Sequence, residues 1–121
     1  LDPATATAAY RRATTLSKAG KYSSAVTSFT LAIQQKQDYA LAYNGRGHAY
    51  LRLKRYAEAI ADFDEAIRIN PAYAAALRYR ASAKRSLGDA AGAEADELEA
   101  KKVKQGSADT PVRRSPKKRR R

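Results

Sequence analysis

The stretch ALAYNGRGHAYLRLKRYAEAIADFDEAIRINPAY, residues 40–73, decides the fold of this 121-residue chain, because its pattern also occurs upstream and downstream. Upstream, the same residue types stand 34 positions earlier. The matching pairs are Tyr22/Tyr56, Ala25/Ala59, Phe29/Phe63, Ala32/Ala66 and Tyr39/Tyr73. A fixed period of this length is typical of a helical hairpin copied along a chain.

The downstream copy is weaker, since its aromatic positions hold Ala90 and Glu97. Its small residues persist in the triplets Ala13/Gly47/Ala81, Ala25/Ala59/Ala93 and Ala32/Ala66/Ala100. We therefore expect a repeat domain over 1–105, with copies at about 6–39, 40–73 and 74–105, and a separate segment over 106–121.

Helical periodicity and breakers predict an all-α chain with two helices in each copy. Asp2 and Asp89 are expected N-caps, Asn70-Pro71 closes the middle copy, and Gly106 is an expected terminator. The predicted helices cover 3–19, 22–35, 40–53, 56–69, 74–87 and 90–104.

The middle copy resembles the tetratricopeptide repeat (TPR) family. The residues at the family's spacing are Tyr43, Gly47, Tyr50, Tyr56, Ala59, Phe63, Ala66 and Pro71. The resemblance implies an α-solenoid of three antiparallel hairpins, which bury their apolar faces by stacking. Copy three has Lys84 and Glu97 where copy two has Tyr50 and Phe63, so we expect it to be the C-terminal end of the stack, either wet or covered by a partner.

The resemblance also implies a concave surface lined by the first helix of each hairpin, where family members hold their partners. Projected onto this sequence, that partner groove comprises Tyr10, Thr14, Asn44, His48, Arg52, Arg78, Ser82 and Arg85, with Ser17 and Leu51 beside them.

Charge differs between the two helices of a hairpin. The first helices carry Arg11, Arg12, Lys18, Arg46, Arg52, Arg78, Arg80, Lys84 and Arg85, and no carboxylate. The second helices of copies two and three carry eight carboxylates. This segregation favours a basic groove for an acidic peptide or protein. The alternative is that these charges solvate the helices and pair across the hairpins.

One TPR subtype clamps the C-terminal carboxylate of heat-shock chaperones with lysine, asparagine and arginine. The matching positions here hold Tyr10, Thr14, Gly45, Ala75 and Tyr79, so we do not expect this subtype.

The residues offer no support for an enzyme, a metal site or a cofactor. The chain has no cysteine, and His48 is its only histidine, which leaves no metal-ligand set and no catalytic triad. A non-catalytic scaffold or adaptor is therefore expected.

The C-terminal segment is strongly basic, and residues 101–121, with 10 Lys or Arg and one Asp, carry most of the formal net charge of +12. Its composition predicts disorder in isolation and attraction to nucleic acid or another polyanion. Its cations are Arg113, Arg114, Lys117, Lys118, Arg119, Arg120 and Arg121.

Three functions therefore stay open: a peptide-binding adaptor, a nucleoprotein subunit anchored by the tail, and a unit that stacks end to end into filaments. No run of apolar residues is long enough to span a membrane. Because Leu1 is not methionine, we expect a processed chain (exported or organellar) or a truncated one, and the basic tail also fits a nuclear protein.

Overall fold

The computed structural model describes residues 1–107 and consists there of six helices without a strand. They are α1 (Pro3–Lys18), α2 (Tyr22–Gln35), α3 (Ala40–Arg52), α4 (Tyr56–Ile69), α5 (Ala74–Ser86) and α6 (Ala90–Ser107). The all-α prediction is confirmed, and each helix begins at the predicted residue.

Local chemistry explains where the helices start and stop. Asp2 caps α1 by accepting a hydrogen bond from the Ala4 amide at 3.0 Å, and Asp89 accepts one from the Gly92 amide at 2.8 Å. The turn inside each hairpin uses a left-handed residue, with φ of 78° at Gly20 and 89° at Gly88. The equivalent residue of the middle hairpin is Lys54, with φ of 63°, a conformation that disfavours a side chain by about 1–2 kcal/mol.

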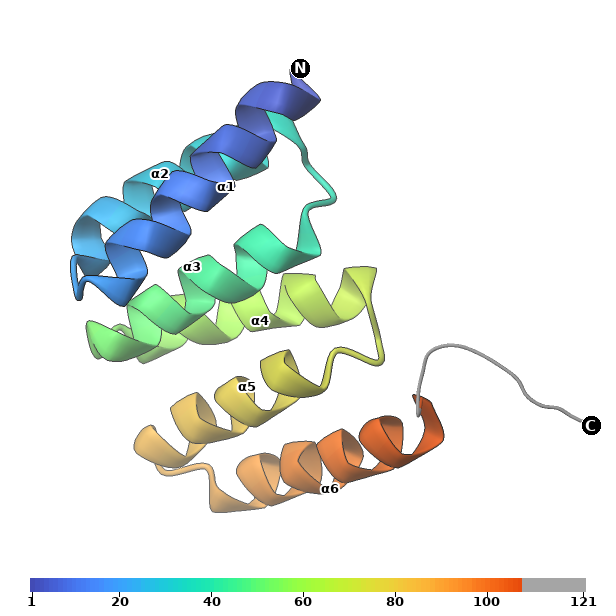
Figure 1. The fold of residues 1–121 in the computed structure, drawn as a ribbon. Coiled ribbons are helices and arrows are strands. Elements are labelled where there is room, and N and C mark those ends of the chain that lie inside the picture. The colour runs from blue at the N-terminus through green and yellow to red at the C-terminus, as the bar shows by residue number, and fades with distance from the viewer. Residues whose placement is uncertain (108–121) are drawn as a thin grey trace, which may run out of the picture.

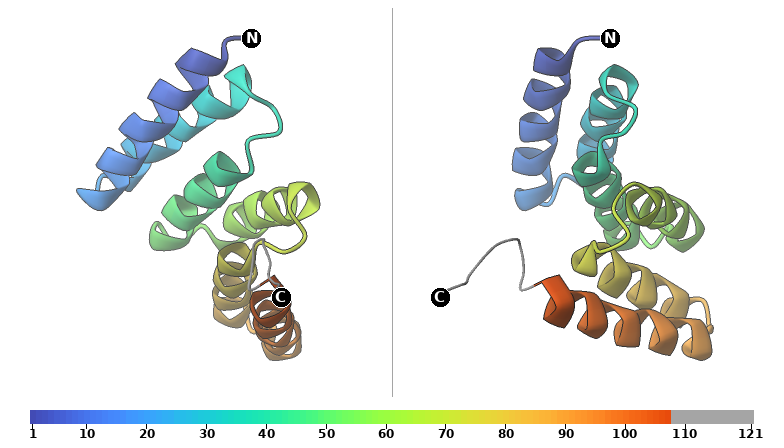
Figure 2. Two further views of the ribbon diagram at one scale, coloured as in Figure 1. Left: turned by 45° about the vertical axis from the view of Figure 1, so that its right-hand side comes forward. Right: turned by 90° about the vertical axis from the view of Figure 1, so that its right-hand side faces the viewer.

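Three hairpins, α1–α2, α3–α4 and α5–α6, stack in chain order (Figure 1). The first helices α1, α3 and α5 succeed one another along the stack and form the surface here called the first-helix face (Figure 1). Helices α2 and α4 lie behind α1 and α3, and α6 lies below α5 at the end of the stack. The turned views show that successive hairpins rotate relative to one another, as in a superhelix (Figure 2).

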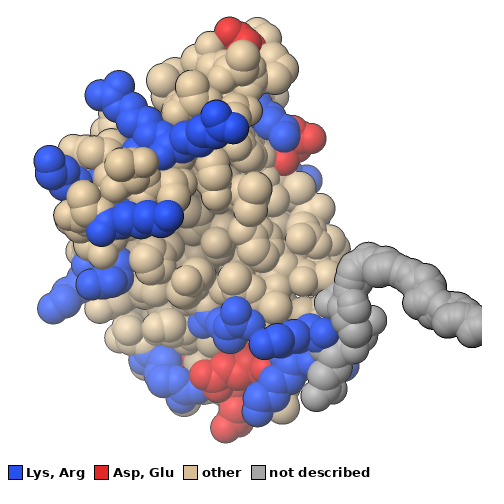
Figure 3. Space-filling model, in the orientation of Figure 1, with Lys and Arg blue, Asp and Glu red and all other residues tan. Residues whose placement is uncertain are grey.

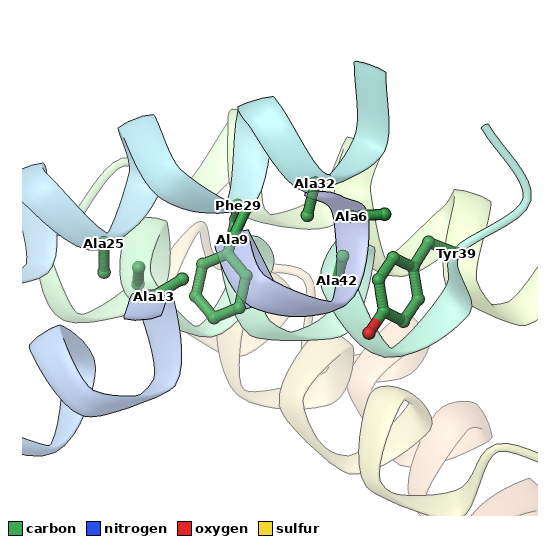
Figure 4. Close-up of a cluster of buried hydrophobic side chains, with 9 residues drawn as sticks. Ala6, Ala9, Ala13, Ala25, Phe29, Ala32, Tyr39 and Ala42 are labelled. Carbon is green, nitrogen blue, oxygen red and sulfur yellow. The ribbon is translucent and has the colours of Figure 1, made fainter. Parts of the chain in front are cut away.

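Alanine makes the close helix packing possible, and aromatic rings fill what remains. In the first core cluster, Phe29 projects from α2 among small side chains of α1, α2 and α3, and Tyr39 closes one end (Figure 4). In the second cluster, Phe63 is the largest fully buried side chain of the described chain. Each hairpin thus buries its apolar face against the next one.

Two glycines of α3 leave room for these rings. A Cβ atom at Gly45 would stand 2.4 Å from Cζ of Phe29, and one at Gly47 would stand 2.7 Å from Cε1 of Phe63. Repeat packing therefore explains both glycines, as the sequence predicts.

The last helix corrects one prediction. Gly106 does not terminate α6, which continues to Ser107, two residues beyond the predicted domain boundary. A glycine inside a helix costs only about 1 kcal/mol relative to alanine, so it does not by itself end one. Within residues 1–107, no helix is long and apolar enough to cross a membrane. The predictions for the tail concern residues outside the described part of the chain.

Candidate functional site on the first-helix face

Four predicted groove residues, Tyr10, Thr14, Asn44 and His48, line one cavity of about 390 Å³. The other lining residues are Ser17, Lys18, Tyr22, Phe29, Leu41, Gly45 and Tyr79. They come from α1, α2, α3 and α5, so all three hairpins contribute to it. We call this cavity the aromatic pocket.

The rings of the pocket contact one another in two groups, Tyr10 with Phe29 and His48 with Tyr22 and Tyr79. The Tyr10 ring lies 5.8 Å from that of Phe29, and the His48 ring lies 6.4 Å from Tyr22 and 4.9 Å from Tyr79, between centroids. Offset and edge-on pairs at such distances stabilise one another, which fixes the shape of the walls.

The pocket exists at this junction because of one repeat position. Gly45 and Tyr79 are 34 residues apart and therefore equivalent. Between the second and third hairpins, Tyr79 stacks on Phe63 at 5.8 Å and fills the space. Between the first and second hairpins, Gly45 has no side chain to fill the corresponding place, and the Phe29 ring lies directly against its backbone.

Asn44 is the one described side chain with a buried polar atom that lacks a partner: no hydrogen bond reaches its Oδ1. The Asn44 side chain also interacts with Tyr73. Burial raises the pKa of Tyr73 to about 12, and hydrogen bonding by Asn44 opposes this shift. A buried acceptor without a donor is unfavourable by about 1–3 kcal/mol, so Asn44 is poised to accept a hydrogen bond.

His48 lies half-buried between the Tyr22 and Tyr79 rings, with Arg52 nearby. Burial lowers the pKa of His48 below its ordinary value of 6.5, and the positive charge of Arg52 lowers it further. The imidazole is therefore neutral at pH 7, and protonation is harder in the folded chain than in the unfolded one.

This shift predicts that His48 makes the fold less stable in mild acid. Because the unfolded chain binds the proton first, the stabilising contribution is present above pH 6.5 and is lost as pH falls below it. The melting temperature should fall less between about pH 7.5 and about pH 5.5 for His48→Gln than for wild type. An equal difference in the two proteins would contradict the assignment.

The remaining predicted groove residues lie elsewhere on the first-helix face. The Arg52 guanidinium sits 5.1 Å above the Tyr22 ring, at the edge of the aromatic pocket. Arg78 lines a second cavity of about 550 Å³, together with Glu97, Ala100, Lys101 and Lys104. Ser82 is exposed on α5, and Arg85 pairs with Glu97 at 2.8 Å.

Four of the nine first-helix cations pair with carboxylates across the hairpins, as the alternative interpretation proposed. Arg46 makes a bidentate pair with the buried Asp62, with both bonds at 2.8 Å. Arg80 binds Asp96 in the same way, 34 residues further along. The other two pairs are Lys84–Asp96 and Arg85–Glu97.

Arg46 and Arg80 also reach back to the preceding hairpin. Nη1 of Arg46 donates to the Thr30 hydroxyl at 3.1 Å, and Nη1 of Arg80 donates to Asp64 at 2.8 Å. Each guanidinium thereby ties its own second helix to that of the preceding hairpin. We call these two sets of bonds the arginine ties.

The two buried aspartates differ in pKa because their surroundings differ at one position. Burial raises the pKa of Asp62, although Arg46 opposes it. Burial acts in the same direction on Asp96, but bonds from Arg80 and Lys84 outweigh it and lower the pKa. Tyr50 occupies the place in the middle hairpin that Lys84 has in the last, so Asp62 has no second cation.

The surface of the first-helix face reflects this pairing. Its centre carries few charges, with Lys and Arg gathered along one edge and around the last hairpin, where acidic side chains lie among them (Figure 3). Lys18 and Arg52 form no ion pair within residues 1–107. The lining of the aromatic pocket includes Lys18 and no carboxylate.

Sequence reasoning missed six lining residues, namely Lys18, Tyr22, Phe29, Leu41, Gly45 and Tyr79, as groove residues. It placed Tyr22 and Phe29 in the second helix of the first hairpin, and the predicted groove comprised first helices only. The usable signal was the pairing of Phe29 with Gly45 and of Phe63 with Tyr79 at the same repeat positions. Within residues 1–107, no group of His, Cys, Asp and Glu side chains could hold a metal ion.

Three stacked helical hairpins with a pocketed first-helix face define an α-solenoid repeat protein. Family models for the tetratricopeptide repeat match residues 40–73 and 15–54. The chain is a tetratricopeptide repeat protein. No curated protein sequence matches it significantly.

Solved structures of TPR domains are similar over most of the chain. The second TPR of Spaghetti (RPAP3) bound to HSP90 peptide SRMEEVD is 29% identical, with a TM-score of 0.80, over 82% of this chain and 92% of that one. The second TPR domain of human RPAP3, in complex with HSP70 peptide SGPTIEEVD, is 29% identical, with a TM-score of 0.80, over 85% and 86%. The TPR2AB domain of yeast Sti1, at 24% identity and a TM-score of 0.86 over 89% and 42%, shares the fold.

Proposed function

We propose that this chain is a non-catalytic adaptor that holds an acidic peptide segment of a partner protein on its first-helix face. The observation that carries the proposal is the aromatic pocket, whose lining contains a cation and no carboxylate. Two similar TPR domains have been solved with bound peptides, SRMEEVD and SGPTIEEVD, which supports a peptide as the partner.

The charges beside the pocket favour an acidic ligand. Lys18 and Arg52 have no carboxylate partner in the described chain, whereas Arg46 and Arg80 are fully engaged in the arginine ties. Unpaired cations at the rim of a site attract an acidic segment and orient it as it approaches. Beside the aromatic pocket, the cations of the predicted basic groove are thus Lys18 and Arg52.

Reversing these two charges should abolish most of the binding. The probes are two fluorescein-labelled peptides, SRMEEVD with a free C-terminus and an amidated nonapeptide, Gly-Asp-Glu-Gly-Phe-Gly-Glu-Asp-Gly. We expect Lys18→Glu/Arg52→Glu to weaken binding of whichever probe binds wild type by at least about tenfold in fluorescence anisotropy.

Arg68→Glu is the matched control, because Arg68 is an exposed cation on α4, away from the pocket. Its binding should equal that of wild type within about twofold. Circular dichroism checks that each variant is folded. If neither probe binds wild type, or if the pocket variant binds as well as the Arg68 variant, the adaptor proposal is wrong.

The two other functions stay predictions from sequence. The nucleoprotein function depends on the tail, which is outside the described residues. End-to-end stacking would place Arg12, the repeat equivalent of Arg46, opposite Leu98, the equivalent of Thr30 and Asp64. No arginine tie could form there.

A further inference from the structure

We infer that the aromatic pocket takes an aromatic or long aliphatic side chain from the interior of a peptide, with acidic residues flanking it, and not a peptide's terminal carboxylate. The inference rests on the proposed function and specifies its ligand. It follows from three features of the pocket, which concern its walls, its hydrogen-bonding groups and its rim.

The walls suit an apolar side chain. Tyr10, Tyr22, Phe29 and Tyr79 present rings to a cavity of about 390 Å³, near the lower end of the usual range for ligand sites of roughly 300–1,000 Å³. Leu41, which is half exposed at 50%, adds an apolar edge. An apolar group placed there is removed from water on several sides, which is the main source of affinity in small recognition sites.

The pocket is poorly equipped for a carboxylate. A terminal carboxylate needs several donors, and strong sites supply guanidinium groups or clustered lysines. Among the lining residues only Lys18 is cationic, His48 is held neutral at pH 7, and Thr14 already donates its hydroxyl to the Tyr10 carbonyl at 2.9 Å. Gly45 stands at one of the positions where the chaperone-binding subtype has a clamp residue. An asparagine or lysine there would collide with the Phe29 ring.

Asn44 provides the hydrogen bond that would hold the peptide backbone beside the anchored side chain. Its Oδ1 is buried and accepts no bond in the described chain. A peptide N–H that reaches Oδ1 therefore supplies a donor to an acceptor that has no partner in the described chain. Oδ1 of Asn44 lacks a hydrogen-bond donor, and the N–H of an internal peptide unit can supply one.

The rim determines what flanks the anchor. Lys18 lies at one side, and Arg52 lies over Tyr22 at another. Acidic residues next to the anchor in sequence can reach these cations while the anchor stays in the pocket. Basic flanking residues would be repelled, so charge gives the site its selectivity.

A positional peptide series tests the inference on the full chain by fluorescence anisotropy. The probe is the amidated nonapeptide described above, with its central residue changed in turn to Phe, Tyr, Trp, Leu, Ala and Gly. We expect the four apolar residues to bind at least about tenfold more tightly than Ala or Gly. Replacing the four acidic residues by lysine should abolish binding.

The competing ligand is the same peptide with central Gly and a free C-terminus, together with SRMEEVD. If either of these binds more tightly than the amidated Phe peptide, the inference is overturned while the adaptor proposal stands. Equal binding of the Phe and Ala peptides also overturns it. The absence of binding by every probe contradicts the adaptor proposal itself.

A cycle of variants tests the Asn44 contact. N-methylation at each of the three central peptide positions removes one N–H at a time. We expect one of these peptides to lose about tenfold in affinity for wild type and nothing for Asn44→Leu. If all three lose affinity equally in both proteins, the backbone contact is absent. Asn44→Leu keeps the side-chain volume, and circular dichroism checks that it is folded.

Discussion

Phe63→Ala should lower the free energy of unfolding by about 3–5 kcal/mol, the range for removing a buried phenylalanine. Phe63 is fully buried, and its ring lies against the Cβ position of Gly47 and stacks on Tyr79. Small domains are stable by only about 5–15 kcal/mol in total, so the variant should be close to unfolding. Urea titrations followed by circular dichroism measure the difference.

Leu98→Ala is the control for this prediction, since Leu98 is 60% exposed on the last helix. Its effect should stay within about 0.5 kcal/mol. Phe63→Leu should fall between the two, because it leaves a smaller cavity. If Phe63→Ala and Leu98→Ala had similar effects, the ring would not be part of the packed core.

Arg46→Met should be the second severe change, with a loss of about 3–5 kcal/mol at pH 7, because it leaves the Asp62 carboxylate buried without its partner. The Asp62 side chain is only 7% exposed, and no other cation contacts it in the described chain. Adding Asp62→Leu should restore most of the stability, since a buried apolar pair can replace a buried ion pair.

The third hairpin supplies a matched control for Arg46. In Arg80→Met, Asp96 would keep Lys84 at 3.1 Å, so the loss should be clearly smaller. The loss of stability in Arg46→Met should also shrink as pH falls. The raised pKa of Asp62 means that its carboxyl group becomes neutral at a higher pH than an ordinary aspartate, and a neutral group no longer needs the arginine. Equal losses in the two variants would mean that Lys84 does not compensate.

The helix boundaries could be predicted from sequence because they depend on local chemistry. Gly20, Asn70-Pro71 and Asp89 act within a few residues of where they stand, and the structure has helix ends at those places. Gly106 misled the prediction for the same reason, since a single glycine is a weak signal without the residues around it.

The site was harder to predict because it depends on which residues meet across the hairpins. The cations of the first helices look alike in sequence, yet Arg46 and Arg80 form ion pairs with buried aspartates while Arg52 stays at the pocket edge. The difference follows from contacts 16 residues apart, Arg46 to Asp62 and Arg80 to Asp96, which recur one period later. That recurrence was visible in the sequence, whereas the aromatic pocket required the packed structure.

The arginine ties should give the two junctions between hairpins different resistance to a pulling force. The tie between the first two hairpins ends on the neutral hydroxyl of Thr30, and the tie between the last two ends on the carboxylate of Asp64. Under tension from the two ends, the first junction should part before the second, since its tie lacks the attraction between opposite charges that joins Arg80 to Asp64. The aromatic pocket spans that first junction, so a stretched molecule would lose the pocket, and with it the proposed peptide site, before the second junction parts.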